Sequence, residues 1–229
     1  MTARPRCQGR WPVKPPGRWN TLAAVRNATA LRVVGPASFL AELDALLSVY
    51  GAAMRPPPLH LPGRRSIMAR HAGYAEFRAV TVADNGGDGG DGGDGGDGQL
   101  IAFAYGFRGT RGQWWHDVVR TGLTAAAGQH VAAAWLADSF EVAEVHVRPG
   151  YQRRGIGRAM VLGLTAGCPR RTALLSTLDA ASPARRLYAS LGFTDLLTGF
   201  SFPGNEPPYA VMGAALPLRE SPASPRPSR

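Results

Sequence analysis

A mixed α/β (α+β) fold is predicted for this chain of 229 residues, with a central sheet of about six to seven strands and helices on both faces. Two observations predict it. Segments with the period of a strand alternate with segments of helical period. The first strands follow one another as antiparallel neighbours, whereas a strand–helix–strand unit in the middle indicates a parallel pair. The length suits one domain with a single apolar core.

The first predicted elements are a short strand at 31–34 and an amphipathic helix of about 16 residues. Gly35-Pro36 opens this helix, because proline is favoured in a first turn. Prolines 56–58 end it, since proline lacks the amide donor and clashes with a continuing turn. A further helix is predicted near 64–71. The apolar residues at helical spacing in the first helix are Phe39, Leu40, Leu43, Leu46, Leu47 and Tyr50.

Two antiparallel strands are predicted next, at 77–82 and 100–107. The segment 84–98 between them repeats Gly-Gly-Asp and has nothing apolar to bury, so we expect a flexible hairpin loop. A calcium-binding repeat is the alternative for these aspartates. The apolar residue that would anchor each turn of such a repeat is missing.

The second half of the chain alternates between the two periods more regularly. Trp114 begins a segment that we expect to be helical as far as Leu123. The elements expected after it are a strand at 140–147, a helix at 155–167, a strand at 172–176, a helix at 182–190, and strands at 194–202 and 209–216.

Both ends of the chain lack periodicity, which leaves 30–217 as the predicted domain. Residues 1–29 are rich in Pro, Arg and Gly, and 218–229 in Pro, Ser and Arg, so we expect disorder in both. Much of the net charge of +10 lies in the N-terminal extension. A basic arm can contact nucleic acid or anionic lipid. A solvated extension is the favoured interpretation, and nucleic acid is not expected as a partner.

The composition excludes several classes of protein. No apolar run suits a secretory signal, and no stretch of about 18 apolar residues suggests a membrane span. Cys7 and Cys168 are too few for a disulfide framework, so a reducing cytoplasm is expected. Lys14 is the single lysine among 26 Lys and Arg, which indicates a GC-rich, bacterial coding sequence.

The segment 145–159 carries the strongest chemical signal, because a strand ends near Pro149 and a helix begins a few residues later. The first amides of a helix have no intrahelical acceptors, and together with the helix dipole they can hold a diphosphate. Gly155 and Gly157 would keep side chains away from the phosphate oxygens. Neither a P-loop nor a dinucleotide-binding motif is present. The arginines that add charge to this mouth are Arg153, Arg154 and Arg158.

Gln152-Arg153-Arg154-Gly155-Ile156-Gly157 resembles the Q/R-x-x-G-x-G/A signature of the GNAT (Gcn5-related) N-acetyltransferase superfamily. The segment 184–193 resembles the A-x-x-L-Y-x-x-x-G-F helix and turn of the same family. The resemblance extends over 31–216 and is strongest over 140–193. It implies the GNAT fold with a splayed parallel strand pair, acetyl-CoA as co-substrate, and acetyl transfer to a primary amine of a small molecule or peptide in a ternary complex. The cofactor-binding residues that it implies are Val145, His146, Val147, Gln152, Arg153, Arg154, Gly155, Ile156, Gly157, Arg158 and Ser182.

Acetyl transfer needs a neutral amine, a polarised thioester carbonyl and a proton for the departing thiolate. The resemblance implies that backbone groups of 145–147 polarise the carbonyl and that Glu141 receives the amine proton, usually through water. Glu144 is the alternative base, but strand alternation predicts that it lies on the opposite face from Glu141. A water without any side-chain base is the third possibility. Tyr188 is the candidate acid for the thiolate, or else a core tyrosine packed with Leu187 and Leu191.

Some features depart from the family or stay open. Many relatives have Asn where this chain has Ala181, so Ser182 would have to take over that contact with the donor. His146 is interpreted as a packed or exposed histidine, and no cluster has metal-ligand spacing. A non-catalytic acyl-CoA sensor is the rival function. The acceptor is open, and a homodimer is compatible with the sequence. Candidates to wall the acceptor pocket are Trp114, Trp115 and Tyr209.

Overall fold

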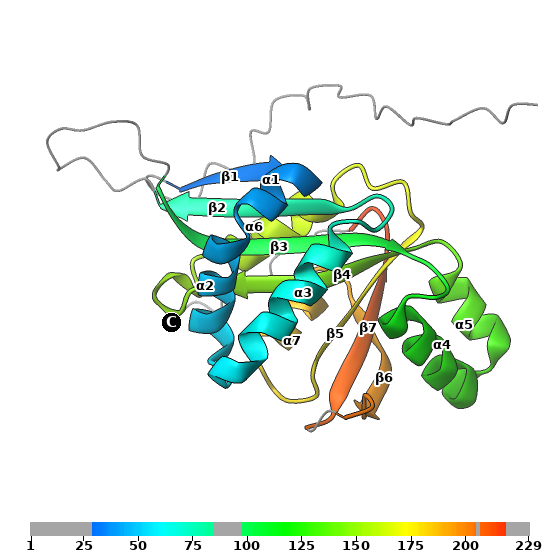
Figure 1. Cartoon of the computed structure of the whole chain (residues 1–229). Coiled ribbons are helices and arrows are strands. Elements are labelled where there is room, and N and C mark those ends of the chain that lie inside the picture. The colour runs from blue at the N-terminus through cyan, green and yellow to red at the C-terminus, as the bar shows by residue number, and fades with distance from the viewer. Residues whose placement is uncertain (1–28, 85–97, 205–206, 219–229) are drawn as a thin grey trace, which may run out of the picture.

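The computed structural model describes residues 29–84, 98–204 and 207–218, in which seven strands form one sheet in the order β1-β2-β3-β4-β5-β7-β6 (Figure 1). The predicted basic extension, most of the Gly/Asp loop and the C-terminal tail lie outside the described residues. The strands are β1 (Thr29–Val34), β2 (Arg78–Asp84), β3 (Gln99–Gly109), β4 (Ser139–Val147), β5 (Thr172–Leu178), β6 (Thr194–Phe200) and β7 (Tyr209–Ala215).

The pairing confirms the predicted mixed sheet. Strands β1 to β4 are antiparallel neighbours, and β7 pairs antiparallel with both β5 and β6. Strands β4 and β5 are parallel, but only 139–141 of β4 pairs with 172–174 of β5. Beyond Glu141 the two strands diverge, so the sheet is split at its centre (Figure 1).

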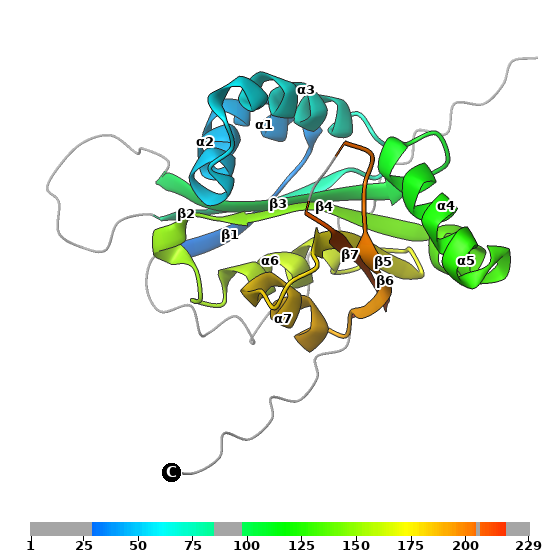
Figure 2. The same ribbon diagram turned by 90° about the horizontal axis from the view of Figure 1, so that it is seen from below.

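Helices cover both faces of the sheet, as predicted. Figure 2 shows α1, α2 and α3 on one side of the strands and α6 and α7 on the other, with α4 and α5 beside the end of the sheet. The helices are α1 (Pro36–Ala41), α2 (Leu43–Met54), α3 (Leu61–His71), α4 (Trp114–Ala127), α5 (Gln129–Leu136), α6 (Ile156–Thr165) and α7 (Pro183–Ser190), with short 3₁₀ turns at Pro58–His60 and Pro149–Tyr151.

Two helical predictions differ from the structure. The single helix expected after Pro36 is two helices, because the backbone of Glu42 leaves the helical region (φ −92°, ψ 9°) between α1 and α2. Helix α5 was not predicted. Only Ala132 and Leu136 of this helix are buried, so its sequence has no strong apolar period to reveal it.

Three apolar clusters hold these layers together. One lies between the sheet and the helices α6 and α7, and a second between the sheet and α1 to α3. The third, around Leu123 of α4, Leu136 of α5, and Leu174 and Val211 of the sheet, holds the α4–α5 hairpin on β5 and β7. Helices of the described ranges are all too short or too polar to cross a membrane.

Candidate active site

The loop between β4 and α6 has a backbone that only certain residues adopt easily. Gly155 precedes α6 with φ 83°, in the left-handed region. Glycine adopts this conformation without the clash that a Cβ would cause. Arg153 also has a positive φ of 60°, which is uncommon for a residue with a side chain. The loop is therefore held in a locally strained shape that turns the chain sharply into α6.

The amides at the start of α6 are available to an anion. The first hydrogen bond of this turn joins the amide of Ala159 to the carbonyl of Gly155 at 3.0 Å, so the amides of 156–158 have no intrahelical acceptor. The side chain of Ile156 is buried under the helix, whereas Arg153 and Arg154 are exposed at its mouth. Backbone donors and positive charge thus coincide, as the sequence predicts.

The structure shows why glycine is favoured at positions 155 and 157, and these reasons differ from those expected from the sequence. A Cβ on Gly155 would meet nothing within 4 Å, so its positive φ is the constraint. A Cβ on Gly157 would lie 3.1 Å from Cδ2 of Leu187. Gly157 therefore permits close packing of α6 against α7, in addition to any role at the mouth.

Two of the predicted donor-binding side chains, Gln152 and Arg158, form hydrogen bonds that stabilise the loop between β4 and α6. The Nε2 of Gln152 donates to the carbonyl of Val147 at 3.1 Å and ties the loop to the end of β4. The Nη1 of Arg158 donates to Oγ of Ser190 at 3.2 Å and links α6 to α7. The guanidinium of Arg154 lies over the ring of Tyr151, 5.1 Å from its centroid.

Backbone groups of β4 face the split between β4 and β5. The amide of Arg148 donates to Ile101 of β3 at 2.9 Å. Backbone groups alternate in direction along a strand, so those of Val145 and Val147 point away from β3 into the split, and those of His146 point toward β3. Of the three predicted residues, Val145 and Val147 therefore offer free-edge amides to a bound chain.

A β-bulge in β4 overturns one expectation from the sequence. Tyr105 of β3 pairs with Glu144, but the next residue, Gly106, pairs with Val142, so Ala143 is an extra residue in β4. The extra residue restores the phase, and Glu141 and Glu144 share the face that packs under α1 to α3. The prediction that strand alternation separates the two carboxylates is wrong.

Both carboxylate oxygens of Glu144 have hydrogen-bond partners. Its Oε1 accepts a hydrogen bond from Nη1 of Arg64 in α3 at 2.5 Å, and its Oε2 is hydrogen-bonded to Nε2 of His146. Burial alone would raise the pKa of Glu144, but His146 and Arg64 outweigh burial and hold this pKa below its usual range. His146 is thus a buried, paired histidine, and its ring also packs 5.1 Å from that of Tyr50.

Glu141 has the opposite electrostatic character. It is 5% exposed, and its Oε2 has no hydrogen-bond partner among the residues that the structure describes. Burial, with the charge of Glu144 as the second cause, raises the pKa of Glu141 to about 8. A carboxyl group with this pKa can accept and release a proton near neutral pH.

Tyr188 lies in α7, on the face of the sheet opposite α1 to α3 (Figure 2). The helix begins as predicted, since Oγ of Ser182 accepts the amide of Arg185 at 3.1 Å. Tyr188 is buried, with its ring 5.9 Å from that of Phe193, and burial together with the charge of Glu144 raises its pKa to about 12. The phenol is therefore neutral and carries a proton at physiological pH.

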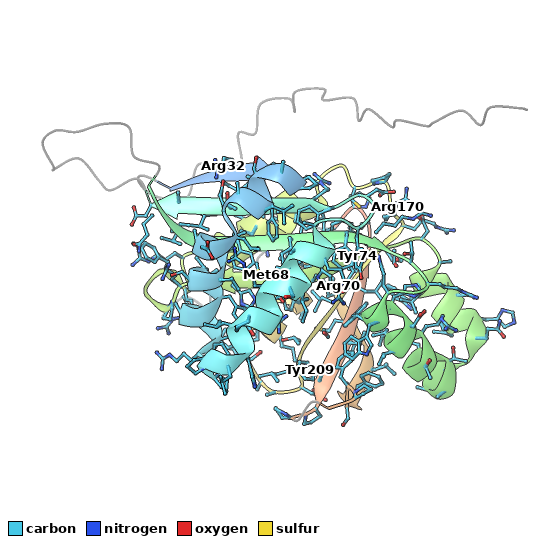
Figure 3. All side chains as sticks on the ribbon, in the orientation of Figure 1. Arg32, Met68, Arg70, Tyr74, Arg170 and Tyr209 are labelled. Carbon is cyan, nitrogen blue, oxygen red and sulfur yellow. The ribbon has the colours of Figure 1, made fainter. Side chains whose placement is uncertain are left out.

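The predicted acceptor-wall residues separate into two groups. Trp115 donates from Nε1 to Oγ of Ser176 at 3.1 Å and is part of the packing. Trp114 is 57% exposed, and its ring lies 5.8 Å from that of Phe202, which in turn lies 5.4 Å from that of Tyr209. Phe202 was not predicted. Figure 3 shows Tyr209 on β7, below the helix α3 that carries Met68 and Arg70.

Part of this chain is similar in sequence to known acetyltransferases. Residues 97–195 match the family model of the acetyltransferase (GNAT) domain. A GCN5-like protein acetyltransferase of Mycobacterium tuberculosis is 40% identical over 123 residues, which are 52% of this chain and 60% of that protein. The match therefore spans less than two thirds of the relative's length.

Solved structures share the fold at low sequence identity. The ribosomal-protein-S18-alanine N-acetyltransferase of Escherichia coli has a TM-score of 0.53 at 16% identity, over 88% of this chain and 99% of its own. The yncA protein of Salmonella typhimurium, solved with acetyl-CoA, has a TM-score of 0.52 at 16% identity, over 86% and 98%.

Proposed function

The chain belongs to the GNAT superfamily of acetyltransferases, and on this premise we propose that it moves the acetyl group of acetyl-CoA to a primary amine by direct attack in a ternary complex. The acceptor would be a small molecule or a peptide. The observation that carries the proposal is the buried carboxyl of Glu141, with a pKa of about 8, at the point where β4 and β5 diverge.

The donor would lie along β4. The diphosphate fits the amides of 156–158 and the exposed guanidinium groups of Arg153 and Arg154. The pantetheine arm would enter the split and form hydrogen bonds with the backbone groups of Val145 and Val147 at the edge of β4. An amide at this edge can polarise the thioester oxygen.

Glu141 is the better candidate base of the two carboxylates. The two carboxylate oxygens of Glu144 are already hydrogen-bonded to Arg64 and His146, and its pKa is lowered, so it has little affinity for a proton. An alkylammonium group has a pKa of about 10.4 and is mostly protonated at neutral pH. Glu141 would accept this proton, directly or through a water, and leave the amine able to attack.

Tyr188 would supply the proton for the departing thiolate. Replacing Tyr188 with Phe is expected to lower kcat by about 10²-fold and to leave the dissociation constant of acetyl-CoA unchanged, since only the hydroxyl is lost. Steady-state kinetics and calorimetry measure the two quantities. Tyr74→Phe, which removes a hydroxyl from a ring packed on Phe107, is the matched control and should keep its rate. Wild-type kcat in Tyr188→Phe would remove Tyr188 from the mechanism.

The double variant Arg153→Ala/Arg154→Ala tests the donor loop. We expect KM for acetyl-CoA to rise at least tenfold with little change in kcat, because contacts to the diphosphate are the same in the ground and transition states. The control Arg32→Ala/Arg65→Ala also loses two charges, both from exposed ion pairs of little energetic value. An unchanged KM in the loop variant, or an equal rise in the control, contradicts this assignment of the loop.

The overall function is tested with acetyl-CoA and a panel of polyamines, aminoglycoside antibiotics, amino acids and peptides with free N-termini. Mass spectrometry should detect the gain of one acetyl group on at least one acceptor class. Peptides and proteins are included because the mycobacterial relative is named a protein acetyltransferase. Binding of acetyl-CoA without product on any amine would favour a non-catalytic sensor, for which the Ala181 substitution is the sequence argument. No binding of acetyl-CoA would refute both functions.

A further inference from the structure

A cavity of about 650 Å³ lies at the end of the sheet opposite the α6 loop, between α4, α5 and the end of β3. Its walls include Arg108 and Arg111 from β3 and the turn after it, Arg120 and Thr124 from α4, and Gln129 from α5. Strand β4 begins beside this cavity and ends beside the α6 loop, so about 25 Å of strand separates the two places. Figure 1 shows the α4–α5 hairpin at that far end.

The cavity is strongly positive. Three arginines line it, and none of its lining residues is acidic. The carboxylate of Asp117 is nearby, 3.6 Å from Nη2 of Arg120, but its Oδ2 already accepts the amide of Gly112 at 2.9 Å. Three positive charges thus face one partly engaged negative charge, which leaves a net charge of about +2 for a ligand to balance.

The guanidinium groups of Arg108 and Arg111 lack partners within the described part of the chain, and that of Arg120 has only the ion pair with Asp117. The Nε of Arg120 is buried and has no hydrogen-bond acceptor there. The side chains of Arg108 and Arg111 likewise form no hydrogen bond or ion pair with a described residue. A buried N–H group without an acceptor destabilises the protein because it has lost its hydrogen bonds to water. An anion in the cavity would accept these hydrogen bonds and remove that free-energy penalty.

We propose that this cavity binds the phosphate group of a small molecule. Guanidinium groups present paired N–H donors that match phosphate oxygens, and a phosphate monoester has the double negative charge that the site requires. The volume exceeds what a free phosphate ion fills and lies in the range of small-molecule sites. The remaining wall is apolar, from Ala132, Ala133 and Leu136, and suits an uncharged body attached to the phosphate.

Binding of phenyl phosphate by calorimetry tests the proposal, with inorganic phosphate and benzoate as comparison ligands. All measurements use the full chain carrying Arg153→Ala/Arg154→Ala, so that the α6 loop contributes little anion binding whatever its function. Phenyl phosphate should bind at least tenfold more tightly than either comparison ligand. Adding Arg120→Gln should weaken its binding at least tenfold. The matched control Arg32→Gln removes one charge from β1 and should leave binding unchanged.

Exposed Arg111→Gln is a second test in case Arg120→Gln does not fold, because Arg111 makes no described contact that the fold depends on. It too should weaken the binding of phenyl phosphate. The proposal is overturned if phenyl phosphate does not bind, if Arg120→Gln and Arg111→Gln both bind as tightly as Arg32→Gln, or if benzoate binds as well as phenyl phosphate.

Discussion

Replacing Glu141 with Gln is expected to lower kcat/KM for the amine by about 10²- to 10⁴-fold at pH 8, the range that a positioned general base contributes. The substitution keeps the size and shape of the side chain, so the dissociation constant of acetyl-CoA should not change. Glu42→Gln, at an exposed ion pair with Arg32, is the control and should keep full activity. Retention of activity in Glu141→Gln would assign the role of base to Glu144 or to water.

The pH dependence gives an independent readout of the same group. Glu141 acts as a base only when deprotonated, and its pKa is about 8, so the wild-type rate should rise as the pH increases through about 8. The variant Glu141→Gln should lose this rise and keep only the ionisation of the acceptor amine. Matching profiles for the two proteins would exclude Glu141 as the titrating group.

The ionisation of Glu141 should also make the free energy of unfolding depend on pH, in a direction that its raised pKa predicts. The pKa of Glu141 is higher in the folded protein than its ordinary value of 4.5, so its contribution is fully present below pH 4.5 and is lost as the pH rises through about 8. Urea unfolding of wild type and Glu141→Gln between pH 5 and 9 should therefore show wild type losing stability relative to the variant. Glu144, with its lowered pKa, contributes in the opposite direction.

Replacing Gly106 with Ala is expected to have the largest effect on stability, a loss of about 3 kcal/mol in the free energy of unfolding. A Cβ at this position would lie 2.3 Å from the carbonyl oxygen of Glu141 and 2.6 Å from the ring of Phe140. Neither neighbour can move without shifting β4. The added methyl would therefore displace Glu141 as well, and any folded variant should have a reduced kcat.

Gly63→Ala in α3 is the matched control. A Cβ there meets nothing within 4 Å, and alanine is the better helix former by about 1 kcal/mol, so this variant should be more stable than wild type. Urea unfolding of both variants measures the contrast. Equal stability of Gly106→Ala and wild type would mean that the β3–β4 pair tolerates the methyl group, and would contradict the close approach of Gly106 to Glu141 and Phe140.

The sequence predicts the junction between β4 and α6 well because its constraints are local. The Ser182 cap is a property of a few adjacent residues, and residue type alone indicates it, whereas the left-handed φ of Gly155 emerged only from the structure. The shared face of Glu141 and Glu144 could not be predicted in this way. The bulge depends on how β4 registers against β3, and β4 itself contains no glycine or proline that signals it. The available signal, Gly106, lies on the neighbouring strand.

The aromatic cluster and the arginine cavity escaped prediction for a similar reason. Phe202 meets Trp114 only because the turn after β6 folds back onto the start of α4, 88 residues away in the sequence. Arg120 becomes part of a cavity only because α5 packs beside α4, and α5 has too few buried residues to be recognised from its sequence.

Because the bulge at Ala143 brings Glu144 to the same face as Glu141, the proton affinity of Glu141 also depends on the helices α1 to α3 that cover this face. Arg64 reaches Glu144 from α3, and Glu144 in turn sets part of the charge felt by Glu141. Any displacement of α3 would withdraw that cation, leave the charge of Glu144 less compensated, and make Glu141 hold its proton more tightly. Opening of this layer and the strength of the base are thereby coupled through one carboxylate.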